Sequence, residues 1–216
     1  MGTTNHPIKT QTSSQAKKLL VMLHGVGSDG HDLISLVDYI QPNYPDVYFF
    51  SPHGIENYDQ GDSGYQWFSL QDRENAVLQR ELMRVSPKIL AMIEQKINEL
   101  ELKWSDVILV GFSQGSMLAL YLTLITPQKF TATIAFSGML IAPSQLPQHI
   151  NKTPICLIHG RQDSVVVHDL MEQAQKKLAN LGFEVESYAL DNLAHSIDKR
   201  GIDLMAQFIN KQIPKQ

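Results

Sequence analysis

The chain has 216 residues, of which 43% are hydrophobic and 19% are charged, and its net charge is −4. This composition excludes a disordered or fibrous protein. The net negative charge argues against nucleic acid as a partner, because a basic surface is needed to neutralise phosphates. The length predicts a single domain over residues 18–216, preceded by a polar N-terminal segment, residues 1–17, that could add an edge strand.

The sequence shows no sign of secretion or of a membrane anchor. The first residues are polar and lack the apolar core of a signal peptide, and no apolar run reaches the ~18 residues that a membrane span needs. We therefore expect a cytoplasmic protein without stable membrane insertion. The one cysteine, Cys156, lies in the apolar run "TPICLIHG" and is typical of a small buried hydrophobe. Whether the protein forms a homodimer stays open.

Short apolar runs alternate with longer segments of helical period, a pattern typical of an α/β protein with a mostly parallel sheet flanked by helices. We expect strands at residues 18–25, 47–54, 107–113, 131–138, 155–160 and 184–190, the last one nearer a sheet edge. We expect helices at residues 75–102, 114–125, 167–181 and 197–210. The first helix is either continuous or broken, and Pro87 marks where it would restart. Residues 54–72 show no clear period, and long loops in compact domains are more often functional than idle.

Several strands pass from apolar to small and polar residues at their carboxyl ends, where ligands bind in open α/β sheets. One of them, in "ILVGFSQGSML", contains the pattern G-x-S-x-G from Gly111 to Gly115. In this motif a sharp strand-to-helix turn exposes the serine, and the glycines let strand and helix approach each other. The pattern predicts Ser113 as a nucleophile, although a glycine-rich turn in any doubly wound protein would look similar.

A serine nucleophile needs a base and a carboxylate that orients the base. On this scaffold the acid and then the histidine follow the serine along the chain. Asp163 lies in a loop after a buried strand, so its carboxylate should emerge at the carboxyl end of the sheet. His195 lies after the last strand, from where its loop can reach both partners, and we prefer it to His168 at the start of a helix. The alternatives are a turn-forming Asp163 and a solvated His195.

Acyl transfer also needs hydrogen-bond donors for the tetrahedral oxyanion. The backbone N–H of Gln114, directly after the serine, is one candidate. The loop "HGVGSDG" after the first strand offers a second, which we assign to the N–H of Val26, with a plain glycine turn as the alternative. We expect His24 to brace this loop and not to act as the base. No metal and no cofactor are expected, because the histidines show no metal-binding spacing.

Five segments together closely resemble the phospholipase/carboxylesterase family of α/β-hydrolases, which includes the acyl-protein thioesterases: "LHGVGSDGHDLI", "GYQWFSL", "GFSQGSMLALYLTL", "HGRQDSVV" and "AHSI". The resemblance implies an α/β-hydrolase fold without a large cap domain. It implies hydrolysis of carboxylic esters and, in some members, of thioesters or lysophospholipids. It also implies Ser113 as nucleophile, Asp163 as orienting carboxylate and His195 as base, with Val26 and Gln114 supplying the oxyanion hole.

The chain departs from the family at Ser116, where many members carry a second glycine, and "GYQWFSL" is more similar to the bacterial esterase branch. The residues expected to line an acyl pocket are Trp67, Phe68, Met139 and Leu140, with ordinary packing as the alternative. The function expected is a serine hydrolase that cleaves small-molecule or lipid-like carboxylic esters through an acyl-enzyme. Two alternatives stay open: a lysophospholipase or acyl-protein thioesterase with the same triad, and a catalytically silent binding protein of the same fold.

Overall fold

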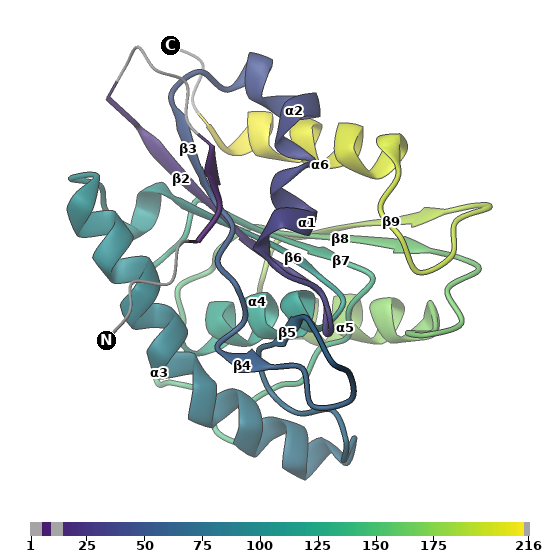
Figure 1. Cartoon of the computed structure of the whole chain (residues 1–216). Coiled ribbons are helices and arrows are strands. Elements are labelled where there is room, and N and C mark those ends of the chain that lie inside the picture. Colours follow the sequence, from purple (N-terminus) through teal and green to yellow (C-terminus); the bar gives the residue numbers. More distant parts are fainter. Residues whose placement is uncertain (1–5, 10–14, 214–216) are drawn as a thin grey trace.

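The fold is built on a seven-stranded sheet, seen in a computed structural model that describes residues 6–9 and 15–213 (Figure 1). The strand order is β1-β3-β2-β6-β7-β8-β9. All neighbouring pairs from β3 to β9 are parallel, and β1 pairs antiparallel with β3 at one edge. The strands are β1 Ile8–Lys9, β2 Lys18–Leu23, β3 Val47–Phe50, β6 Val107–Phe112, β7 Ala132–Phe136, β8 Ile155–Gly160 and β9 Val185–Leu190. The alternating strand β9 forms the other edge, as its pattern predicted.

The chain changes direction across the sheet next to β2. From β2 it moves outward to β3, then crosses back over β2 to β6, after which β7, β8 and β9 follow in order. In such sheets the carboxyl ends of the two strands on either side of the switch, here β2 and β6, form a crevice. The loops that follow these two strands are therefore neighbours at one end of the sheet.

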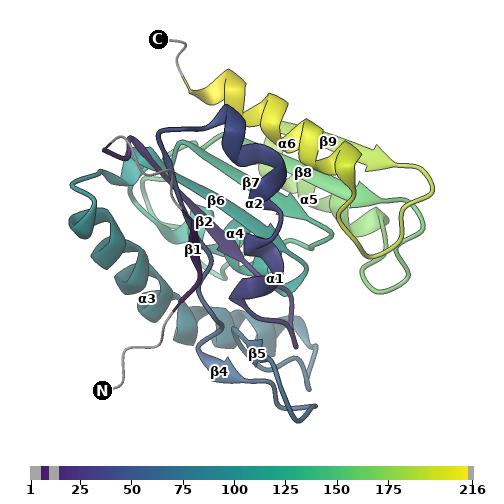
Figure 2. The same cartoon turned by 45° about the horizontal axis from the view of Figure 1, so that its top comes forward.

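Helices cover both faces of the sheet, which confirms the predicted α/β architecture. Figures 1 and 2 show α1, α2 and α6 on one face and α3, α4 and α5 on the other. The helices are α1 Gly30–Ile34, α2 Val37–Ile40, α3 Asn75–Glu99, α4 Gln114–Ile125, α5 Asp169–Asn180 and α6 Lys199–Gln212. A small hairpin, β4 Glu56–Asn57 and β5 Tyr65–Gln66, and two 3-10 turns, Gln41–Asn43 and Trp104–Asp106, complete the described elements. In the described part of the chain, no helix combines the length and apolar character needed to cross a bilayer.

The central strands are apolar on both faces because both faces are covered. In β2, Leu19 and Val21 belong to the core beneath α3 and α4, whereas Leu20 and Met22 belong to the core beneath α1, α2 and α6. All four side chains are buried, and each contributes about 1.5–3 kcal/mol by leaving water. A shift of the strand by one residue would exchange the two sets, so the packing of both cores fixes the register.

Helix α3 runs without interruption through Pro87, so the restart considered for this proline does not occur. A proline in a helix interior removes a hydrogen bond and costs about 3 kcal/mol. Side chains on the same helix, among them Val85, Ile89 and Ile93, are fully buried in the core, and their burial outweighs that cost. The sequence analysis also missed α1 and α2, because helices of 5 and 4 residues are too short to show a helical period.

Candidate active site

The turn between β6 and α4 holds Ser113 in a strained backbone conformation. Its φ is 53° and its ψ is −114°, a region that residues other than glycine rarely occupy. At the second residue of α4, a Cβ on Gly115 would lie 1.9 Å from the carbonyl oxygen of Leu23, the last residue of β2. Glycine therefore lets α4 approach β2 this closely. The pattern G-x-S-x-G reflects this contact, and the turn carries Ser113 to the carboxyl ends of β2 and β6.

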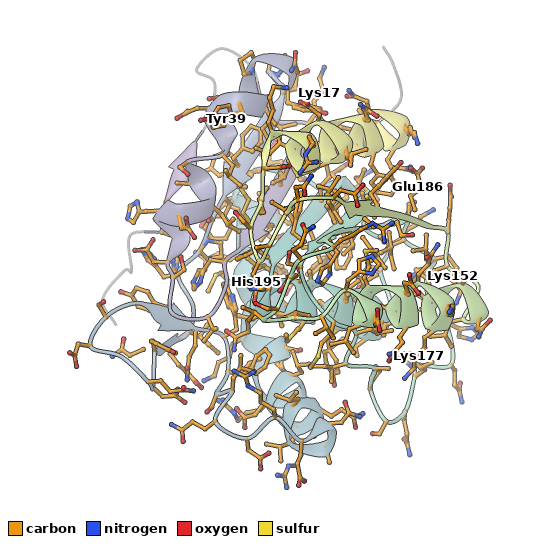
Figure 3. The ribbon with its side chains drawn as sticks, turned by 90° about the vertical axis from the view of Figure 1, so that its right-hand side faces the viewer. Lys17, Tyr39, Lys152, Lys177, Glu186 and His195 are labelled. Atoms are coloured by element: carbon orange, nitrogen blue, oxygen red, sulfur yellow. The ribbon has the colours of Figure 1, made fainter. Side chains whose placement is uncertain are left out.

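The structure brings Ser113, His195 and Asp163 together from three separate segments. His195 Nδ1 lies 2.7 Å from Asp163 Oδ2, and because a carboxylate can only accept, Nδ1 carries the ring proton and donates. His195 Nε2 can therefore accept the hydroxyl proton of Ser113, whose Oγ lies 2.9 Å away. Ser113 and Asp163 are buried, while the side chain of His195 is 18% exposed and lies near the centre of Figure 3. This arrangement can move a proton from the serine to a histidine held by a carboxylate.

Asp163 is fully engaged in hydrogen bonds. Its Oδ1 accepts from the backbone N–H groups of Val165 and Val166, each at 2.9 Å, and its Oδ2 accepts from His195. Burial by itself would raise the pKa of this carboxyl, but the hydrogen bonds from His195 and from Val166 outweigh burial, and the pKa lies below its ordinary value. Asp163 is therefore ionised at neutral pH. It also forms the tight turn considered as an alternative.

The loop that carries His195 lies directly on the loop that carries Asp163. Gln162 N–H donates to the carbonyl of Leu193 at 3.0 Å. At the end of β8, a Cβ on Gly160 would lie 2.2 Å from the same carbonyl oxygen, so the contact needs glycine. These backbone contacts set the spacing between the imidazole and the carboxylate.

The loop after β2 lies beside the serine. A Cβ built on Gly25 would lie 3.5 Å from the Cβ of Ser113. Neither the backbone N–H of Val26 nor that of Gln114 donates to an acceptor within the described residues. Free backbone N–H groups next to a nucleophile are what an oxyanion hole requires before substrate binds.

The side chain of Gln114 ties the start of α4 to the segment after β5. Its Oε1 accepts from Trp67 N–H at 2.9 Å, and its Nε2 donates to the carbonyl of Phe68 at 2.6 Å. Trp67 and Phe68 have no exposed surface and pack in the core with residues of α3 and α4. The structure therefore corrects the expectation that these two rings line an acyl pocket: they fill the core and support the site from below.

His24 braces the start of the loop after β2. Its Nε2 accepts from Gly54 N–H at 2.8 Å, so its Nδ1 carries the proton and donates to the carbonyl of Gly25 at 2.7 Å. Trp67 Nε1 donates to the His24 carbonyl at 2.8 Å. Burial lowers the pKa of His24, although the Gly25 carbonyl opposes this shift. With a neutral ring and both nitrogens engaged, His24 has no free position from which to act as a base.

Ser116, the departure from the family pattern, joins the ends of two strands. Its buried Oγ lies 2.7 Å from the carbonyl oxygen of Gly111 on β6 and 2.6 Å from that of Phe136 on β7. A hydroxyl has one proton, so it donates to one of these carbonyls at a time. A glycine at this position would lack the link.

The remaining candidates lie around this centre. Met139 and Leu140 are half-buried and pack against two different parts of the core, so their contact with an acyl group stays a prediction. His168 faces other groups than the serine: its ring centroid lies 6.0 Å from that of His159. Burial raises the pKa of the Cys156 thiol to about 12, so it is no nucleophile at neutral pH. Among the residues the structure describes, no group of three or more His, Cys, Asp or Glu side chains is placed to hold a metal ion.

Three contributions to the site were missed by the sequence analysis. The Phe112 ring packs on the His195 imidazole, with centroids 4.9 Å apart. The Gln114 side chain makes the bridge described above, and His159 Nε2 lies 3.2 Å from Asp163 Oδ2. Phe112 and His159 lie within the segments "GFSQG" and "HGRQD", so their place beside Ser113 and Asp163 in the sequence could have indicated them. The partners of Gln114 lie too far away in sequence for any local pattern to indicate them.

Comparison with known proteins decides the family. The sequence pattern of the phospholipase/carboxylesterase family matches residues 5–213. The chain belongs to this family. The esterase YpfH of Escherichia coli (strain K12) is 27% identical over 212 residues, which cover 98% of this chain and 90% of the relative. Acyl-protein thioesterase 1 of Saccharomyces cerevisiae is 28% identical over 215 residues, which cover 92% of this chain and 94% of the relative.

Solved structures agree with the phospholipase/carboxylesterase assignment. The crystal structure of esterase PE8 matches with a TM-score of 0.90 and 35% identity, over 96% of this chain and 98% of that one. Arabidopsis thaliana SOBER1 matches with a TM-score of 0.79 over 91% of this chain and 99% of that one, and at 23% identity it supports the fold alone. This member of the phospholipase/carboxylesterase family is therefore an α/β-hydrolase and an enzyme of the carboxylesterase type.

Proposed function

We propose that the protein is a serine hydrolase that cleaves carboxylic esters, with Ser113 as nucleophile, His195 as general base and Asp163 as the orienting carboxylate. The observation that carries the proposal is the chain of hydrogen bonds from Ser113 Oγ through His195 to Asp163. The strained turn that presents Ser113 at the strand end supports the same role. Membership of the phospholipase/carboxylesterase family supports the reaction class.

The reaction proceeds through an acyl-enzyme. His195 Nε2 takes the hydroxyl proton while Ser113 Oγ attacks the ester carbonyl carbon, and the charge of Asp163 stabilises the imidazolium. The N–H groups of Val26 and Gln114 bind the oxyanion, each contributing about 2.7–4 kcal/mol. His195 then protonates the leaving alcohol as its C–O bond breaks. Water, deprotonated by His195, attacks the acyl-enzyme, and the carboxylic acid departs as Ser113 regains its proton.

The substrate we propose is a small-molecule or lipid-like ester. Half-buried Met139 and Leu140 follow β7 at the same end of the sheet, and Val165 and Val167 beside Asp163 are exposed and apolar. These side chains suit an acyl group. A thioester is the second candidate, and the yeast relative's name favours it.

Covalent labelling tests the nucleophile. We expect a fluorophosphonate to add one adduct to the folded wild-type protein at Ser113, measured by intact mass and peptide mapping, because only an activated serine reacts. Ser113→Ala should lose both the adduct and ester turnover while keeping its circular dichroism spectrum. Ser116→Ala removes a buried hydroxyl in α4, three residues after Ser113; it serves as control and should still be labelled. Retained turnover in Ser113→Ala would refute the assignment.

A substrate panel distinguishes the alternatives. Nitrophenyl esters of increasing chain length are compared with a lysophospholipid and an acyl thioester, with Ser113→Ala as the blank. Fastest kcat/KM on the esters supports a carboxylesterase. A clear preference for the thioester or the lysophospholipid would reassign the substrate while keeping the triad. Absence of turnover on every substrate, together with absence of an adduct, would identify a catalytically silent binding protein.

A further inference from the structure

A second histidine contacts the Asp163 carboxylate from inside the protein. His159, on β8, places its Nε2 3.2 Å from Asp163 Oδ2, the same oxygen that accepts from His195. The other oxygen, Oδ1, already accepts from two backbone N–H groups. Oδ2 thus accepts from the imidazole in the candidate site and has the imidazole of His159 close to it on the core side.

His159 faces the carboxylate as a neutral imidazole. Its Nε2 lies 2.7 Å from the carbonyl oxygen of Val166, and because a carbonyl only accepts, Nε2 carries the proton. The side chain is almost completely buried. Burial lowers the pKa of His159, although the Val166 carbonyl and the charge of Asp163 oppose this shift. The neutral N–H therefore donates to Val166, and Nε2 also lies 3.2 Å from Asp163 Oδ2 without donating to it.

His159 also contacts the ring of His168. His168 meets it at an interplanar angle of 88°, with ring centroids 6.0 Å apart. His168 Nδ1 lies 4.0 Å from Glu172, and its Nε2 is buried without a hydrogen-bond partner in the described structure. The titratable groups around Asp163 are thus His195 on the site side and His159 on the core side, with His168 and then Glu172 behind.

We propose that His159 is a positioning residue for the ester hydrolysis. The Val166 carbonyl holds its ring against Asp163 Oδ2, so that Oδ2 stays directed at His195 and the positive end of the Nε2–H dipole reduces the negative potential at this oxygen. The inference rests on the proposed function, because it needs His195 as the base. Two consequences follow: the alignment of the imidazole supports kcat, and Oδ2 beside this dipole attracts the Nδ1–H of His195 less strongly, so activity persists to lower pH.

The test is the pH profile of kcat/KM in position-159 variants. His159→Leu removes the Nε2–H group, and we expect kcat/KM to fall about tenfold because the Asp163 carboxylate is no longer held in a fixed orientation. The midpoint of the acid limb should move up by roughly 0.5–1 pH unit, as expected for the loss of one polar N–H close to the carboxylate. His159→Gln can place an amide N–H near the former Nε2, so it should restore the wild-type midpoint and most of kcat/KM.

The asparagine side chain of His159→Asn is too short to reach the Val166 carbonyl and lie beside Asp163. This variant should therefore behave like His159→Leu, and it replaces His159→Leu if the leucine variant does not fold. The matched control is Cys156→Ala, a fully buried position on the same strand that packs in the opposite core. It should lower stability and leave the midpoint unchanged. A midpoint in the Leu or Asn variant that equals the wild type, or moves to lower pH, would overturn the inference. Failure of the proposed function would instead be seen in the wild type, as a missing adduct on Ser113.

Discussion

Gln114 contributes to the candidate site through its side chain as well as its backbone. Its amide satisfies an N–H and a carbonyl of the adjacent residues Trp67 and Phe68, both in the core. A side-chain amide is suited to this bridge because it carries a donor and an acceptor on one carbon. The bridge holds the first residue of α4, whose backbone N–H we assign to the oxyanion hole. Stability and catalysis should therefore depend on the same side chain.

Gln114→Glu tests this bridge at almost unchanged shape. The glutamate keeps an acceptor for Trp67 N–H, but its second carboxylate oxygen faces the Phe68 carbonyl oxygen. The alternative, protonation of this buried carboxyl, costs free energy. We expect the free energy of unfolding to fall by about 2–4 kcal/mol, measured by urea unfolding, with a lower kcat on a short nitrophenyl ester. The exposed Gln173→Glu on α5 is the control and should change stability by less than about 0.5 kcal/mol. Equal stabilities of the two variants would contradict the bridge.

The position of α4 relative to β2 depends on contact between their backbones. The Cβ position of Gly115 is occupied by the Leu23 carbonyl, which cannot move without disturbing the pairing of β2 with β6. Just after α5, Gly182 has a φ of +80°, but a Cβ there would meet only Lys152 Cε, at an ordinary contact distance of 3.7 Å. Glycine is thus needed at the two positions for different reasons: Gly115 allows α4 to contact β2, and Gly182 allows a left-handed turn.

The same substitution at these two positions should separate the two reasons. Gly115→Ala forces α4 away from β2, and we expect it to cost about 3 kcal/mol or more and to abolish esterase turnover. Gly182→Ala adds only the strain of a left-handed alanine, about 1–2 kcal/mol, and should keep full kcat. Thermal unfolding and ester hydrolysis measure both. Full activity in Gly115→Ala would show that the close contact is dispensable.

Buried neutral histidines link the stability of the whole molecule to pH. Burial lowers the folded-state pKa of both His24 and His159 from an ordinary value of 6.5. Between that value and the lowered ones, the unfolded chain binds more protons than the native protein, so the free energy of unfolding falls as pH falls. Carboxylates with a lowered pKa, such as Asp163, lose their contribution only near and below their ordinary value of 3.8. The histidine effect therefore comes first on acidification.

We expect the urea midpoint to be lower at about pH 5.5 than at about pH 7.5, with a slope of up to roughly 1.4 kcal/mol per pH unit for each histidine. His24→Gln keeps an acceptor for Gly54 N–H but does not titrate, so its slope should be smaller than that of the wild type. The comparison concerns the slope and not the absolute stability. A wild-type stability that is constant or rises over this range, or an unchanged slope in His24→Gln, would disprove the link.

The elements that the sequence predicted are those whose signal is local and repeated. The apolar runs of the six parallel strands and of α4, and the helical period of α5 and α6, are visible without any partner. The short helices α1 and α2 and the hairpin β4–β5 carry too few residues for a period. Pro87 is a local signal for a break in the helix, but the burial of the apolar side chains of α3 outweighs the cost of the proline.

The sequence by itself determined the turn at Ser113 and the order in which Asp163 and His195 follow it, because the steric needs of a strand-to-helix turn are local and the chain order is set by the sheet. Only the tertiary structure decided that Trp67 and Phe68 fill the core and that His159 packs against the Asp163 carboxylate. Whether a side chain faces solvent, core or carboxylate depends on distant segments that meet it after folding. Such contacts leave no period and no spacing in the chain.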